Sequence, residues 1–159
     1  MCGICGFIDG KIDREESGRT LSHMLQMIEK RGPDDSGESI LQAGDYAVAL
    51  GHRRLSIIDT SYAGHQPMKY KSKTIIFNGE VYNYQEITKE LQAKGYTFES
   101  SSDTEVILKA YDCWGVKAFE KFNGMWAFVI YDEETRSMVL CRDRSGVKPL
   151  LWYYDGDRF

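Results

Sequence analysis

The sequence predicts an α+β domain in which largely antiparallel sheets are covered by helices. Two helical patterns lie in the middle of the chain, with strand-like runs on either side, an order typical of α+β rather than alternating α/β folds. The strand-like runs at 75–77 and 125–131 are almost continuously apolar, which indicates strands covered on both faces. The length of 159 residues fits a single domain spanning 1–159.

The N-terminal part of the chain predicts strands separated by one helix. An apolar run at 2–8 predicts a short strand that ends at an Asp-Gly turn. Leu, Met and Ile then recur at helical spacing between 21 and 28. The segment 31–37, Arg-Gly-Pro-Asp-Asp-Ser-Gly, predicts a loop because these residue types favour turns. Two or three strands follow between 38 and 58.

The C-terminal part predicts two helices followed by strands. Asn83 with Glu86 three residues later resembles a capping box, and this helix ends at Gly95. A second helix begins near Asp103 and ends at Gly115. Further strands are predicted at 125–131, 137–141 and 150–154. Residues 155–159 predict a hairpin turn and the first residue of a return strand, so we expect a C-terminally truncated domain.

Composition excludes several classes of protein. With 42% hydrophobic and 28% charged residues, the chain is typical of globular domains rather than disordered ones. The net charge of -4 argues against a nucleic-acid partner. No apolar run is long enough to span a membrane. The N-terminus lacks the basic and apolar regions of a signal peptide, so we expect a cytoplasmic protein.

The four cysteines do not predict disulfides in a cytoplasmic chain. Cys113 and Cys141 lie in apolar stretches and are expected to be buried. Cys2 and Cys5 form a C-x-x-C pair, which could serve redox chemistry, half a zinc site or a role of the terminus itself. The pair does not lie between a strand and a helix, and no second close pair accompanies it. No metal site is therefore predicted.

Cys2 is a candidate nucleophile. If Met1 is removed, Cys2 carries both a thiol and a free α-amine, whose pKa is about 8. The amine can then take the thiol proton, so one residue supplies nucleophile and base. An ordinary cysteine in a buried strand is the alternative, and position alone leaves both open.

Asn78 and Gly79 directly follow a strand-like run and could form an oxyanion hole. An amide side chain beside an unhindered backbone N–H is suited to a developing negative charge. Asn-Gly is also a strong signal for a hairpin turn. The helix that follows, in place of a second strand, argues against the hairpin.

Charged residues near these positions could bind an amino-acid substrate. Arg53 and Arg54 are candidates for a carboxylate, which arginine grips with two hydrogen bonds. Glu80 and Asp103 are candidates for an ammonium group. Each charge taken alone is more often solvated or a helix cap, and Asp103 is itself a plausible N-cap.

Taken together, these segments resemble the class II glutamine amidotransferases, which are N-terminal-nucleophile hydrolases. The resemblance is strongest to the glutaminase domain of glutamine-dependent asparagine synthetases. Six segments match in the family's order and cover nearly the whole chain: Met1–Gly6 (MCGICG), Arg31–Gly37 (RGPDDSG), His52–Ile57 (HRRLSI), Phe77–Asn83 (FNGEVYN), Ser102–Val106 (SDTEV) and Arg142–Pro149 (RDRSGVKP).

The resemblance implies a role for each matching residue. Cys2 matches the nucleophile, its α-amine the base, and Asn78 with the N–H of Gly79 the oxyanion hole. Arg54, rather than Arg53, matches the arginine that holds the glutamine α-carboxylate. The loop at 31–34 is expected to be structural and Cys5 to serve packing only. The remaining substrate contacts implied are Glu80 and Asp103, which bind the α-amino group and neighbouring polar atoms, and the backbone of Leu55, Ser56, Ile57 and Ile58.

The resemblance also implies a fold and partners. The family fold is a four-layer αββα sandwich of two antiparallel sheets, and family domains continue a few tens of residues further. L-glutamine is the implied substrate, with no cofactor in this domain. The ammonia would serve a C-terminal synthetase domain that uses ATP and Mg²⁺ to amidate aspartate, in a possible homodimer. Alternatives are a domain serving sugar or polysaccharide amidation, or a catalytically silent binding domain.

Overall fold

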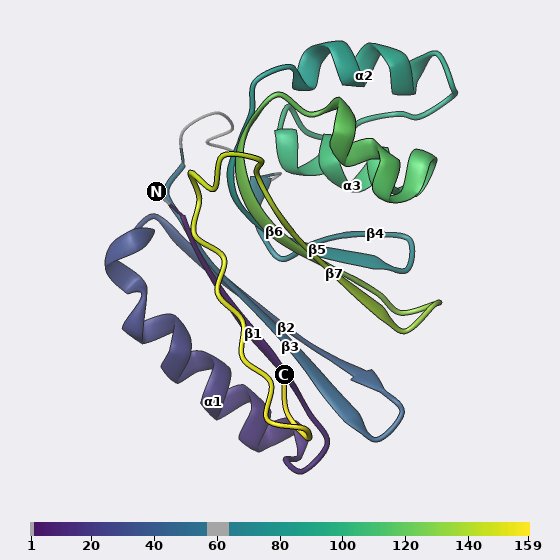
Figure 1. Ribbon diagram of the computed structural model, residues 1–159. Helices are drawn as coiled ribbons and strands as arrows, with labels where there is room; N and C mark the ends of the chain where they lie inside the picture. The colour runs from purple at the N-terminus through teal and green to yellow at the C-terminus, as the bar shows by residue number, and fades with distance from the viewer. Residues whose placement is uncertain (1, 57–63) are drawn as a thin grey trace.

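The computed structural model describes residues 2–56 and 64–159, which form two antiparallel sheets with helices outside them (Figure 1). The first sheet has the order β1-β3-β2 and the second β4-β5-β6-β7. Helix α1 covers the first sheet, and α2 and α3 cover the second (Figure 1). The prediction of an α+β fold with two mainly antiparallel sheets is therefore confirmed. The strands are β1 (Gly3–Asp9), β2 (Asp35–Ala43), β3 (Tyr46–Arg54), β4 (Met68–Tyr70), β5 (Lys73–Val81), β6 (Gly124–Asp132) and β7 (Ser137–Arg142); the helices are α1 (Arg14–Met27), α2 (Tyr84–Gln92) and α3 (Asp103–Trp114), with 3₁₀ turns at Glu29–Arg31 and Gly115–Lys121.

Alternation along β3 determines which residues face the space between the sheets. Val48 and Leu50 are buried there with Ile76 of the second sheet. Ala49, between them, packs on the opposite face against Leu21 of α1. Because successive side chains of a strand point to opposite faces, the later even-numbered residues of β3 also face the second sheet. This alternation directs His52 and Arg54, at the end of β3, toward the second sheet.

The outer face of the second sheet packs on α3 through a separate apolar cluster. Ile75 and Phe77 of β5 contact Val106 and Ile107 of α3 there, and all four side chains are buried. Ser102 caps the helix by accepting the Thr104 N–H at 3.1 Å, which supplies a partner for one of the unpaired donors of the first turn. The start of α3 is thereby fixed next to β5.

Two local predictions in this region are wrong. Asn78 and Gly79 do not follow a strand but lie within β5, which continues to Val81. Asn83 is the N-cap residue of α2 but makes no capping bond from its side chain. Its amide instead donates to Lys121 O at 2.9 Å and accepts the Asn123 N–H at 2.9 Å. These tertiary partners compete successfully with the local capping bond.

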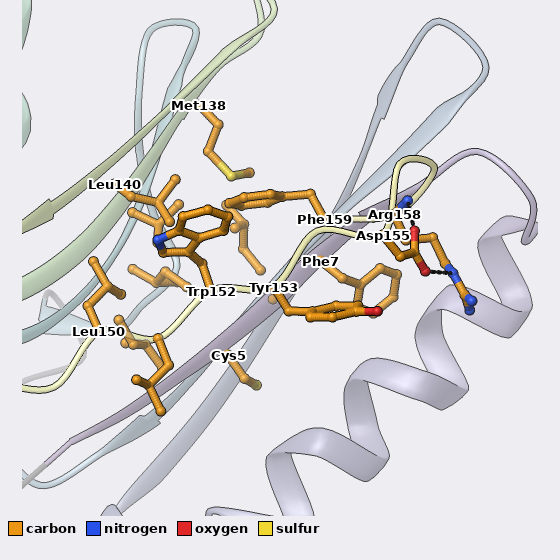
Figure 2. Close-up of a pocket in the computed structure, with 16 residues that line it drawn as sticks. Cys5, Phe7, Met138, Leu140, Leu150, Trp152, Tyr153, Asp155, Arg158 and Phe159 are labelled. Carbon is orange, nitrogen blue, oxygen red and sulfur yellow. Dashed lines mark hydrogen bonds and ion pairs between the residues drawn. The ribbon is translucent and has the colours of Figure 1, made fainter.

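The strand predicted at 150–154 is also absent from the described structure. This segment runs beside β1 (Figure 1) but forms no ladder with it. After a turn at Asp155–Arg158, Phe159 exchanges two backbone hydrogen bonds with Ile8, at 2.7 and 3.0 Å. A cavity of about 490 Å³ lies between this segment and the sheets, and Leu150, Trp152 and Tyr153 line it together with residues of β1 and β7 (Figure 2).

Cys113 and Cys141 are half-buried against the apolar cluster under α3, rather than fully buried as expected. Cys141 also has a polar partner, since the Nε1–H of Trp126 donates to Cys141 Sγ at 3.4 Å. Among the described residues, none of the helices has the length and hydropathy needed to cross a membrane.

Candidate active site

A second, smaller cavity of about 180 Å³ collects most of the residues that the sequence singled out. It shares no lining residue with the apolar cavity of Figure 2. Ser56 is described but does not line it, and Ile57 and Ile58 lie outside the described residues. The lining residues are Cys2, Arg54, Leu55, Gly64, Gln66, Phe77, Asn78, Gly79, Glu80, Ser102, Asp103, Thr104, Met125 and Lys148.

Cys2 is held in this cavity by one contact to its side chain and one to its backbone. Its Sγ lies 3.4 Å from the Leu55 N–H, which points at the sulfur. Its carbonyl oxygen accepts a hydrogen bond from Arg31 Nε at 3.1 Å. β1 and β3 pair with Gly3 opposite Arg53, so the preceding residue, Cys2, lies beside Arg54. The thiol is therefore at the end of the first sheet, on its inner face.

Cys5 lies on the other face of β1 and packs with Leu21 and Leu25 of α1. An odd sequence separation within a strand places two side chains on opposite faces, so Cys2 and Cys5 do not face each other. Burial raises the pKa of the Cys5 thiol to about 11, which makes it a poor nucleophile. No group of three metal-ligating side chains occurs within 2–56 and 64–159.

The loop at 31–34 supports both the nucleophile and the end of β3. Besides the bond from Arg31 to Cys2, the Asp34 carboxylate accepts the Ser56 N–H at 2.8 Å. The Asp34 N–H donates to Arg54 O at 3.0 Å. A β-carbon at Gly32 would lie 2.4 Å from the Arg53 backbone, so this close approach requires glycine. The loop therefore holds the backbone of Cys2 and of the residues at the end of β3 in place.

Arg53 and Arg54 have different surroundings because they alternate along β3. Arg53 points to the outer face and pairs with Glu29, with 2.9 Å between nitrogen and oxygen. Arg54 is 8% exposed and lines the cavity. A guanidinium in that position can bind a carboxylate through two parallel hydrogen bonds. Of these two arginines, Arg54 is the one that lines the cavity with Cys2.

One edge of β5 presents backbone N–H groups to the cavity. The Phe77 N–H donates to Gln66 Oε1 at 2.7 Å, and the Val81 N–H to Asp103 Oδ2 at 2.9 Å. Alternate residues of an antiparallel strand direct their backbone groups to the same edge. The Gly79 N–H therefore points to this edge as well, between two occupied positions, and Gly79 lines the cavity. A backbone donor on a rigid strand at the cavity edge is suited to a developing negative charge.

Asn78 presents its side chain at the cavity, whereas Gly79 allows the neighbouring strand to approach closely. Asn78 shares the inner face of β5 with Ile76, and its side chain is 4% exposed at the cavity. A β-carbon at Gly79 would lie 2.2 Å from Met125 O and 2.7 Å from the Trp126 backbone. Glycine is thus required by the close approach of β6.

Asp103 and Glu80 supply the negative charge of the cavity. Burial raises the pKa of the Asp103 carboxyl to about 6, against the opposing effect of N–H donors from Val81 and Thr104, and the charge of Glu80 raises it further. The alternative of Asp103 as N-cap is wrong, because Ser102 is the cap and Asp103 is the first helical residue. Two carboxyl groups at one end of the cavity are suited to an ammonium group.

Other lining residues were not identified from the sequence. Lys148 is 4% exposed, and its backbone N–H donates to Asp143 Oδ2 at 2.9 Å. It lies within residues 142–149, which match the family without implying a role for this lysine. Gln66, which is 5% exposed, lies outside the six matching segments. Glutamine has no distinctive motif chemistry, so only the fold reveals it.

His52 lies behind the cavity and is neutral. Its ring is 1% exposed, and burial lowers its pKa to about 4. Its Nε2–H donates to Phe77 O at 3.1 Å. Within the described residues, Nδ1 is buried and has no hydrogen-bond partner. His52 therefore contributes structure rather than charge to the β5 edge.

Comparison with known proteins identifies the family of the chain. The sequence matches the family described as glutamine amidotransferase domain over residues 1–159. It is 40% identical to asparagine synthetase [glutamine-hydrolyzing] 3 of Bacillus subtilis, over 100% of this chain and 26% of that protein. Asparagine synthetase B [glutamine-hydrolyzing] of Escherichia coli is 39% identical, over 98% of this chain and 27% of that protein.

A solved structure is similar to this one in fold. It is a glutamine phosphoribosylpyrophosphate amidotransferase from B. subtilis complexed with ADP and GMP. The TM-score is 0.77 at 22% identity, and the match covers 97% of this chain and 40% of that one. At this identity the similarity supports the arrangement of sheets and helices alone.

Proposed function

The chain belongs to the glutamine amidotransferase domain family, and we propose that its smaller cavity hydrolyses the side-chain amide of L-glutamine. One observation carries the proposal. Cys2, the Asn78–Gly79 edge of β5, Arg54 and Asp103 line the same cavity of about 180 Å³. A nucleophile, donors for an oxyanion and opposite charges for both ends of an amino acid are therefore within one substrate's reach.

In the proposed reaction, the Cys2 thiol attacks the side-chain carbonyl carbon of glutamine. The α-amine of Cys2 accepts the thiol proton and passes it to the leaving nitrogen, so that ammonia departs and a γ-glutamyl thioester remains. Water then attacks the thioester, releasing glutamate and restoring the thiol. Asn78 Nδ2 and the Gly79 N–H stabilise the negative oxygen in both steps. This mechanism requires that Met1, which lies outside the described residues, has been removed.

The two charged groups orient the substrate in this proposal. Arg54 binds the α-carboxylate, and Asp103 with Glu80 binds the α-ammonium. Fixing both ends holds the side-chain amide at the sulfur, and such positioning lowers the barrier to attack. Leu55 contributes backbone and already contacts Cys2 Sγ. Backbone contacts from Ile57 and Ile58 remain predictions.

The chain spans about a quarter to a third of the length of the curated relatives it matches, with 26%, 33% and 27% covered in three of them. Their names join glutamine hydrolysis to asparagine synthesis. We therefore propose that the ammonia is used by an ATP- and Mg²⁺-dependent synthetase part of a longer protein to amidate aspartate. A homodimer stays a prediction, which light scattering of the parent protein would check.

Glutamate release from L-glutamine tests the proposed hydrolysis. We expect turnover by the wild-type chain with a free Cys2 amine and none by Cys2→Ala. Cys5→Ala is the matched control and should retain turnover, because Cys5 packs under α1. A glutamine analogue with an electrophilic carbon in place of the amide should label Cys2 alone. A wild-type chain that binds glutamine without releasing glutamate would favour the alternative of a silent binding domain.

A further inference from the structure

Among the described strands, none pairs with the cavity-side edge of β5 from residue 76 to residue 81. β4 pairs only with residues 73–75 of β5, whereas the candidate oxyanion hole lies further along. At Phe77, side chains replace the missing strand. Gln66 Oε1 accepts the Phe77 N–H at 2.7 Å, and His52 Nε2 donates to the Phe77 carbonyl at 3.1 Å. Both backbone hydrogen-bonding groups of Phe77, its N–H and its carbonyl, are thereby paired in the interior.

Gln66 connects this edge to the first turn of α3. Its Nε2 donates to Thr104 Oγ1 at 3.1 Å, while its Oε1 holds Phe77. The side chain is 5% exposed and Thr104 is 2% exposed, so water does not substitute readily for either bond. One side-chain amide thus joins two walls of the cavity, β5 and α3.

Asp103 makes a second connection between the same walls. Its Oδ2 accepts the Val81 N–H at 2.9 Å, four residues along β5 from Phe77. Gly79 lies midway between these two anchored amides, and its N–H points to the same edge. The direction of that N–H is therefore set by the anchors on both sides.

We propose that Gln66 is a positioning residue that holds the Gly79 N–H in line with the developing oxyanion. This inference rests on the proposed hydrolysis and deepens it. Gln66 acts through the backbone of Phe77 and through Thr104. An oxyanion donor is effective only at hydrogen-bond distance from the transition-state oxygen, so a small displacement of β5 lowers turnover more than it lowers substrate binding.

The first test compares Gln66→Met with Gln66→Glu. Methionine fills a similar volume but removes both hydrogen bonds. Glutamate keeps the oxygen for the Phe77 N–H and can accept a bond from the rotatable Thr104 hydroxyl. We expect kcat for glutamate release to fall about tenfold or more in Gln66→Met, with KM within about threefold. Gln66→Glu should recover most of the lost kcat.

Rates are expressed per labelled Cys2 thiol, so that a loss of folded protein does not imitate a loss of turnover. Gln92→Met is the matched control, because Gln92 is an exposed residue at the end of α2. Adding Thr104→Val to Gln66→Met should cause little further loss if the bridge acts as one element. Unchanged kcat per labelled site in Gln66→Met, or equal losses in the Met and Glu variants, would overturn the proposal.

Amide hydrogen exchange provides a readout that does not depend on activity. In Gln66→Met we expect the Phe77 amide to exchange at least about tenfold faster and the Gly79 amide resonance to shift, whereas Gln92→Met leaves both unchanged. Unaltered protection of Phe77 would show that Gln66 does not hold this edge. If the wild-type chain releases no glutamate, the proposed hydrolysis is wrong. Amide exchange would then still test whether Gln66 holds β5.

Discussion

Cys2 and Arg54 lie side by side on the inner face of the first sheet, because β1 and β3 pair with Gly3 opposite Arg53. The register thus determines which of two adjacent arginines accompanies the thiol. A slip of one residue would exchange every side chain between the two faces of the strand. The two faces of β3 differ in side-chain size, with Leu50 between the sheets and the smaller Ala49 under α1, and this difference opposes the slip.

Arg54→Lys should weaken glutamine binding more than turnover. An ammonium group cannot reproduce the planar two-bond contact of a guanidinium with a carboxylate. We expect KM for glutamine to rise about tenfold or more, since a hydrogen bond to a charged group contributes about 1.5–3 kcal/mol, with a small change in kcat. Arg53→Lys is the control, because Arg53 pairs with Glu29 on the outer face. Equal KM changes in both variants would contradict the assignment of Arg54.

Asn78→Ala should lower turnover rather than binding. Loss of one oxyanion-hole donor costs about 10²–10³ in kcat, while the charged ends of the substrate remain held. Steady-state kinetics of glutamate release separates the two parameters. If Asn78→Ala and Arg54→Lys change kcat and KM in the same pattern, the division of roles between these residues is wrong.

Two glycine substitutions should have opposite effects. Gly18 lies inside α1, where a β-carbon would have only an ordinary 3.5 Å contact with Ile40. Gly18→Ala should therefore stabilise the fold by about 0.5–1 kcal/mol. Gly79→Ala would place a β-carbon 2.2 Å from Met125 O, forcing β5 and β6 apart. Thermal unfolding measures both changes, and an unchanged midpoint in Gly79→Ala would contradict the close approach.

The parts of the fold that the sequence predicts well are those with local signals. Apolar periodicity identified α3 and the buried run of β6, because each element buries a regular face. The wrong predictions arise where tertiary contacts decide. The side chain of Asn83 binds Lys121 and Asn123 instead of capping α2. Both partners are distant in the sequence, so the residues around Asn83 do not predict these bonds.

The candidate site divides in a similar way. Cys2, Asn78 and Arg54 carry recognisable chemistry and could be selected from the sequence as candidates. Gln66 could not, because its role depends on the premature end of the β4–β5 ladder and on the approach of α3. Residues that act through backbone geometry leave no chemical signature in a single sequence.

Glutamine binding should weaken as the pH falls through about 6. The pKa of the Asp103 carboxyl is raised to about 6, chiefly by burial, so this group is ionised above that pH and neutral below it. A neutral carboxyl loses the charge attraction for the substrate ammonium. We expect kcat/KM to decline below about pH 6, and Asp103→Asn to be low at all pH values without this limb. An identical acid limb in Asp103→Asn would assign the titration to another group.

A chain that keeps Met1 should be inactive toward glutamine, and its removal should restore hydrolysis without refolding. With Met1 attached, the nitrogen of Cys2 is an amide and has no basic lone pair to accept the thiol proton. The remaining supports of Cys2 do not involve that nitrogen, because Arg31 Nε binds the Cys2 carbonyl and the Leu55 N–H points at Sγ. The thiol should therefore keep its place while lacking its base. Intact mass spectrometry beside a glutamate-release assay, before and after treatment with a methionine aminopeptidase, measures both quantities on the same sample. Full turnover in a sample that retains Met1 would mean that another group accepts the proton, and the mechanism based on the Cys2 amine would have to be abandoned.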